Sequence, residues 1–204
     1  MEVNLLSFLL SVVFVSLSGV MMPGPVFAVT VAKGYRSKVA GVLIALGHGA
    51  IEFPLMFLIY FGFTQFFTST VQRIIGFIGG LILLYMGLQM FKTVKNPTDG
   101  VTEESKHGSF VAGLLTTCTN PYFFLWWITV GATLIMNSMI FGFLGFLMLA
   151  TAHWLCDLSW DSFVGFMVFK SKSFWNKKVR QIVFGFCFVT LICFGVWFII
   201  SALL

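Results

Sequence analysis

The sequence predicts an all-α integral membrane protein with six transmembrane helices. We expect them to form two inverted three-helix repeats, with helices 1 and 4 interrupted at proline motifs. The composition is 59% hydrophobic and 9% charged with a mean hydropathy of +1.00, whereas about a quarter of the residues in soluble domains are charged. The apolar residues form long runs, and two of these runs are interrupted by proline motifs. A chain this apolar cannot cover a surface that faces water.

The length leaves room for little besides membrane helices. A crossing needs about 20 apolar residues, and the chain has 204. We therefore expect one transmembrane domain over residues 1–204, with a first repeat at about 1–92, a polar linker at 93–108 and a second repeat at about 109–204. The six predicted spans are residues 5–32, 39–63, 74–91, 110–135, 140–169 and 182–204.

The positive charges predict the orientation. All but one of the 12 Lys and Arg residues follow an odd-numbered span, and the exception is Arg73. Cytoplasmic loops carry the excess of positive charge, so loops 1, 3 and 5 should be cytoplasmic and both termini should lie outside the cell membrane. The residues of the biased set are Lys33, Arg36, Lys38, Lys92, Lys95, Lys106, Lys170, Lys172, Lys177, Lys178 and Arg180.

A short pattern in the second span recurs in the fifth. His48 and Glu52, preceded by an alanine, return as His153 and Asp157 at one constant offset along the chain. Because each half contains an odd number of spans, the second half must cross the membrane in the opposite sense to the first. The repeat and the charge bias therefore predict the same topology.

Helix breaks are expected in spans 1 and 4. Proline removes a backbone donor and clashes with the preceding turn, which leaves free carbonyls on one side and a new helix N-terminus on the other. Such an N-terminus attracts anions, including carboxylates. At the second motif a simple kink, repaired by neighbouring helices, remains an alternative. The predicted substrate-binding residues at the breaks are Pro23, Gly24, Pro25, Thr119, Asn120 and Pro121.

Three acids fall inside predicted spans: Glu52, Asp157 and Asp161. An acid at a helix centre costs about 2.5–3.5 kcal/mol on insertion scales, so these side chains should face the protein interior. Residues four apart share a helix face, which joins His48 to Glu52 and His153 to both aspartates. We predict cargo binding by Glu52 and Asp157 and proton coupling by all five residues. Hydrogen bonding between helices, worth about 1 kcal/mol, is the alternative.

Other features are less specific. The aromatic residues Tyr122, Trp126 and Trp127 fit packing or an interfacial belt better than a ligand site. The spacing of Gly76 and Gly80 suits close helix packing, within the fold or in a homo-oligomer. Asp161 can lie in a cavity or nearer the cytoplasmic surface, because the fifth span is long.

Two motifs carry a resemblance to a known family. The Met-Pro-Gly-Pro segment at residues 22–25, followed by Lys-Gly-Tyr-Arg at 33–36, and the Thr-Asn-Pro segment at 119–121 resemble the LysE/RhtB amino-acid exporters. Asp157 followed by Trp160 also resembles the family pattern. The resemblance implies secondary export of small amino acids or related metabolites, driven by a proton or ion gradient.

Two further functions remain as alternatives. His and carboxylate pairs on two helices are a plausible ligand set for a divalent metal exporter. They also suit an intramembrane metal-dependent enzyme, which needs about three protein ligands on one metal. We predict a transporter and not an enzyme, with a small-molecule substrate and membrane lipid as partners. We expect no nucleic acid, no cofactor and no resident metal.

Overall fold

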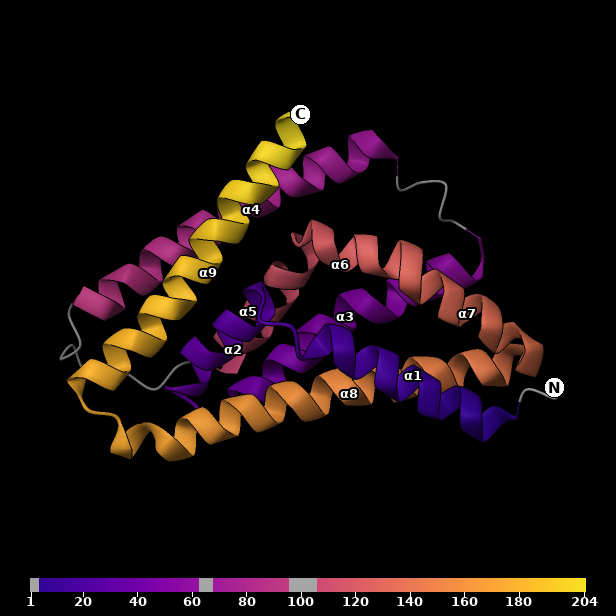
Figure 1. Ribbon diagram of the computed structural model, residues 1–204, viewed down its shortest axis with the longest axis horizontal. Helices are drawn as coiled ribbons and strands as arrows, with labels where there is room; N and C mark the ends of the chain where they lie inside the picture. Colours follow the sequence, from indigo (N-terminus) through magenta and orange to yellow (C-terminus); the bar gives the residue numbers. More distant parts are fainter. Residues whose placement is uncertain (1–3, 63–67, 96–105) are drawn as a thin grey trace.

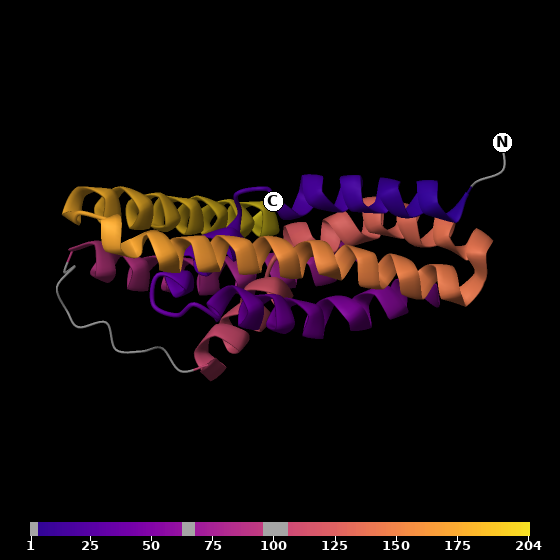
Figure 2. The same ribbon diagram turned by 90° about the horizontal axis from the view of Figure 1, so that it is seen from below.

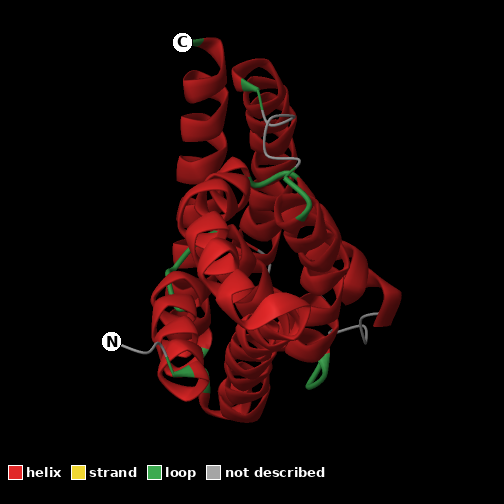
Figure 3. Cartoon of the chain, turned by 90° about the vertical axis from the view of Figure 1, so that its right-hand side faces the viewer, coloured by secondary structure: helices red, strands yellow, loops and turns green. Residues whose placement is uncertain are grey.

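The computed structural model describes residues 4–62, 68–95 and 106–204, and within these ranges the chain forms helices and connecting turns with no strand (Figure 3). The all-α prediction is confirmed. The central part of the predicted linker, residues 96–105, lies outside the described residues, as does the predicted end of the second span at Phe63.

The first predicted span is broken, as expected. Helix α1 (Leu5–Val20) and helix α2 (Pro25–Gly34) are bent by 76° relative to each other across a short break. Gly24 is the N-cap of α2 in an extended conformation, and Pro25 is the first residue of the helix. Proline suits this position because its missing N–H would have no partner in the first turn and its φ already fits a helix. The double-proline segment therefore ends one helix and starts another.

The fourth predicted span is also interrupted at its motif. Helix α5 (Lys106–Cys118) ends before Asn120, and helix α6 (Pro121–Trp126) begins at the proline. The Asn120 side chain accepts a hydrogen bond from the Tyr122 backbone N–H at 3.1 Å, as an N-cap does. The neighbouring Thr119 hydroxyl donates back to the Leu115 carbonyl at 2.6 Å.

The rest of the fourth span continues after α6 and turns into the fifth. It runs through a π-helical turn (Trp127–Gly131), helix α7 (Ala132–Ser138) and a 3₁₀ turn (Met139–Phe141). The chain then reverses at Gly142, whose φ of 66° favours glycine, and enters helix α8 (Gly142–Ser171).

Three further helices complete the fold: α3 (Ala40–Tyr60), α4 (Ser69–Lys95) and α9 (Lys177–Leu203). Helices α4 and α9 begin earlier than predicted. The apolar runs mark the lipid-facing part of a helix, whereas its first turn accommodates polar residues. At α9 this turn is fixed by Asn176, whose side chain accepts from the Val179 N–H at 2.8 Å.

Part of the chain forms helices that can span a membrane. Three helical stretches in the described residues are long and apolar enough to cross a membrane: Ala40–Tyr60, Pro121–Phe174 and Lys177–Leu203. The bent pair α1 and α2 makes a fourth when it is counted as one span. Arg73–Leu88 and Gly108–Cys118 are apolar but shorter.

The helices form a flat bundle in which α8 crosses much of the length of the molecule (Figures 1 and 2). Helices α4 and α9 pack side by side at one end, and α1 lies along α8 (Figure 1). Glycines allow the close approach of α4 and α9. A Cβ on Gly80 would lie 2.6 Å from the Gly195 carbonyl oxygen on α9, so this glycine packs within the fold.

Candidate functional site

Five titratable side chains from α3 and α8 are buried where these helices cross, and they are those predicted from the sequence: His48, Glu52, His153, Asp157 and Asp161. The crossing is tight because a Cβ on Gly41 of α3 would meet the backbone carbonyl of Asp161. The two polar helix faces therefore come together inside the protein.

Glu52 is the centre of this cluster. Its Oε1 atom lies 3.2 Å from His48 Nε2, 3.2 Å from His153 Nε2 and 3.2 Å from Trp127 Nε1. Glu52 has no exposed surface, so a carboxylate there depends on these nitrogen partners. The histidine of each helix was expected to join the acid of its own helix. The structure adds a pairing across the helices, from His153 to Glu52.

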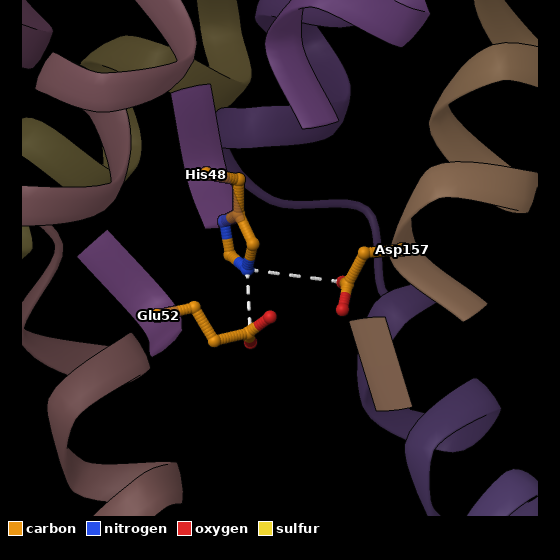
Figure 4. Close-up of side chains that lie close together, drawn as sticks. All are labelled: His48, Glu52 and Asp157. Carbon is orange, nitrogen blue, oxygen red and sulfur yellow. Dashed lines mark hydrogen bonds and ion pairs between the residues drawn. The ribbon is translucent and has the colours of Figure 1, made fainter. Parts of the chain in front are cut away.

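Asp157 lies beside both histidines. His48 Nε2 is 3.8 Å from Oδ1 of Asp157, and His153 Nε2 is 3.4 Å from Oδ2. Figure 4 shows the His48 ring directed towards the Glu52 and Asp157 carboxylates. The buried atoms Glu52 Oε2 and Asp157 Oδ2 have no hydrogen-bond partner. The cluster thus presents more acceptor atoms than its donors occupy.

The far nitrogen of each histidine contacts a hydroxyl group next to a helix break. His48 Nδ1 lies 2.8 Å from Thr117 Oγ1 on α5, and His153 Nδ1 lies 2.7 Å from Ser16 Oγ on α1. The Thr117 hydroxyl also lies 2.8 Å from the Gly113 carbonyl oxygen, and when it donates its one proton there it accepts from His48. In that arrangement the Nδ1 atom of His48 carries a hydrogen.

Asp161 is set apart from the histidines. Its Oδ1 atom accepts a hydrogen bond from the Thr30 hydroxyl on α2 at 3.2 Å, and both side chains are buried. Of the two positions left open by the sequence, the structure places Asp161 in the wall of a cavity.

The cavity, of about 110 Å³, has room for several water molecules. The helix breaks and the polar cluster both contribute to its wall. Among the predicted site residues, those that line it are Gly24, Pro25, Asn120, His48, Glu52, His153, Asp157 and Asp161. Pro23, Thr119 and Pro121 are not among the lining residues, although each belongs to a break that reaches the cavity.

Comparison with known proteins decides the family. A family model described as LysE type translocator matches residues 17–202. The chain belongs to the LysE type translocator family. It is also 26% identical, over 199 residues and 95% of both chains, to the "Putative amino acid efflux protein YcgF" of Bacillus subtilis (strain 168). No solved structure matches the chain. Family membership and the apolar helices make it a multi-pass membrane transport protein.

The two breaks of this LysE type translocator differ in whether a side chain caps the backbone N–H groups of the helix that follows. Gly24 offers α2 no side-chain cap, and Val26 and Phe27 in the first turn line the cavity. At the second break the Asn120 side chain already occupies the Tyr122 N–H. The N-terminus of α2 is therefore the more suitable of the two for an anionic group.

Several residues of the site could not be identified from the sequence. Trp127, assigned there to packing or a belt, is 1% exposed and donates its indole N–H to Glu52. Tyr122 and Trp126 also line the cavity. Single hydroxyl residues such as Ser16 and Thr117 belong to no sequence pattern that indicates a site. Their one signal is position, since each precedes a helix break.

A metal ion is also compatible with part of the cluster. One ligand atom each from His48, Glu52 and Asp157 can be chosen so that all three lie within 4.8 Å of one another. All three residues are buried. This donor set suits a borderline divalent cation better than Mg²⁺ or Ca²⁺, which prefer oxygen ligands alone.

Proposed function

We propose that this protein exports small amino acids or related metabolites across the cell membrane by antiport with a proton or another cation. The observation that carries the proposal is one cavity whose wall contains both a helix N-terminus at a break, Pro25, and buried carboxylates, Glu52 and Asp157. An amino acid needs a partner for each of its two charges. The efflux protein of B. subtilis to which the chain is similar favours the same class of cargo.

The transport cycle we propose is alternating access between two inverted three-helix repeats, with six spans in all. The packing supports this arrangement. Helix α1 packs on α8 as α5 packs on α3, and α2 packs on α9 as α6 packs on α4. The Ser16 contact to His153 has its counterpart in the Thr117 contact to His48. With the positive charge bias, both termini would lie outside and loops 1, 3 and 5 in the cytoplasm.

The carboxylate of the cargo would bind at the N-terminus of α2, where Gly24 leaves the first turn without a side-chain cap. Its ammonium group would bind to Asp157. Glu52 is less suited to the ammonium, because its Oε1 atom already lies within 3.2 Å of three nitrogen atoms. The coupling cation would bind at the cluster of Glu52, Asp157 and the two histidines.

Replacing both Glu52 and Asp157 by their amides tests the proposal. The double variant E52Q/D157N should lose gradient-driven amino-acid efflux from loaded vesicles, because it removes the cation site and the ammonium partner together. Its membrane insertion should persist, since amides keep the volume of the acids. Unchanged efflux in the inserted variant would contradict the proposal.

A further inference from the structure

The trio of His48, Glu52 and Asp157 has an excess of lone pairs. In the tautomer whose Nδ1–H donates to Thr117, a neutral His48 directs the lone pair of Nε2 towards the carboxylates. That atom lies 3.2 Å from Glu52 Oε1 and 3.8 Å from Asp157 Oδ1. Three lone-pair atoms that converge in a buried place call for a cation between them.

The distances and charges suit a divalent ion. Zinc bonds to nitrogen and oxygen are about 2.0–2.2 Å long, which places tetrahedral ligand atoms about 3.4 Å apart. The two distances from His48 Nε2 lie on either side of this value. Two carboxylates and a neutral histidine would balance the charge of a dication in a buried site. The second oxygen of each carboxylate, Glu52 Oε2 or Asp157 Oδ2, is buried without a hydrogen-bond partner, so the protein alone does not satisfy either carboxylate.

The surroundings resemble those of a metal ligand set. Histidines that bind metals commonly make a hydrogen bond through the other ring nitrogen, which fixes the ring, and Thr117 does this for His48. Three protein ligands leave a coordination position open, as in exchangeable zinc sites. All three residues line the cavity, so an ion can reach them along the path of the cargo.

We propose that His48, Glu52 and Asp157 bind a divalent transition metal ion of the Zn²⁺ class, and that the bound ion inhibits transport. The inhibition rests on the proposed function. The ion takes Asp157, which would otherwise receive the ammonium group of the cargo. It also joins α3 to α8, which belong to different halves of the chain, and so opposes their relative movement.

Metal binding is measured first, on purified full-length protein treated with a chelator. Titration with Co²⁺ should give absorption bands of a nitrogen- and oxygen-coordinated ion, saturating at a single ion per chain and displaced by Zn²⁺. The variants H48A and D157N should lose these bands. D161N should keep them, because Asp161 is an equally buried acid of the same cavity outside the trio.

Thr117→Val provides a variant that keeps all three ligands. Loss of such an outer partner weakens metal binding by about 10- to 100-fold, and the Zn²⁺ concentration needed to inhibit efflux should rise by the same factor. Size exclusion in metal-free buffer identifies variants that have not folded. Absence of Co²⁺ binding, or equal binding in folded H48A or D157N, would overturn the proposal.

An efflux assay distinguishes a failure of this inference from a failure of the proposed function. Vesicles loaded with glycine, alanine, serine and threonine are assayed with EDTA and with added Zn²⁺. Efflux that Zn²⁺ does not affect refutes the inhibition. Efflux in EDTA without any metal binding refutes the whole inference and leaves the proposed function standing. Metal binding and metal movement without amino-acid efflux overturns the proposed function together with the inhibitory role.

Discussion

The Nε2 atom of His153 lies 3.2 Å from the Oε1 atom of Glu52, and this contact joins α8 to α3. Neither helix can form the cluster alone, because the acid of one half of the chain is partnered by a histidine of the other. If the two halves are repeats that move against each other, the contact lies where the movement would occur. Any change to it should affect both stability and transport.

Trp127→Phe should destabilise the protein. The substitution keeps an aromatic ring but removes the indole N–H, one of the three nitrogen partners of Glu52 Oε1, and a hydrogen bond to a charged group contributes about 1.5–3 kcal/mol. The midpoint of thermal unfolding in detergent should fall. Trp197→Phe is the matched control, because Trp197 is 54% exposed and should change stability by less than about 0.5 kcal/mol. Equal midpoints for the two variants would contradict the role of the indole.

Gly41→Ala should separate the two site helices. The added methyl group would overlap the backbone carbonyl of Asp161, and such overpacking costs about 1–3 kcal/mol. We expect a lower unfolding midpoint and lower efflux. Gly185→Ala on α9 is the control, since its added methyl group would meet nothing within 4 Å. It should be neutral or stabilise the helix by about 0.5–1 kcal/mol. If both alanines behave alike, the close crossing is not required.

Asn120→Ala tests whether the second break contributes to transport. The Asn120 side chain caps α6, and loss of a cap costs about 0.5–2 kcal/mol. Asn176→Ala removes an equivalent cap from α9, outside the residues that line the cavity. Both variants should lose similar stability, measured by thermal unfolding, whereas N120A alone should lower efflux per folded molecule. Normal efflux by N120A would exclude Asn120 from the cargo path.

The positions of the breaks and of the buried acids could be predicted from the sequence. Proline at residues 25 and 121 dictates where a helix starts, and Glu52 is too costly to expose to lipid. The chemistry of single residues decides both the start of a helix and the burial of an acid. It also predicted that His48 shares a face with Glu52, because a helix brings residues four apart together.

The partners across the helices could not be predicted. The contact from His153 to Glu52 depends on the register in which α3 crosses α8, and that register follows from glycines that admit the opposite backbone. The contact between Trp127 and the same carboxylate depends on the break before α6 and on the π-helical turn after it. Residue patterns within one helix contain no information about such crossings. The starts of α4 and α9 could not be predicted either, because the hydropathy of the sequence does not show that a helix begins with a polar turn.

The most direct test of amino-acid export is substrate-resolved efflux from vesicles that contain the purified protein and a mixture of amino acids. Efflux is followed with and without an imposed pH gradient, beside empty vesicles and vesicles with the E52Q/D157N variant. One or more small amino acids should leave faster than from empty vesicles, the gradient should accelerate this efflux, and the variant should abolish it. Inserted wild-type protein that releases no amino acid under either condition would contradict amino-acid export.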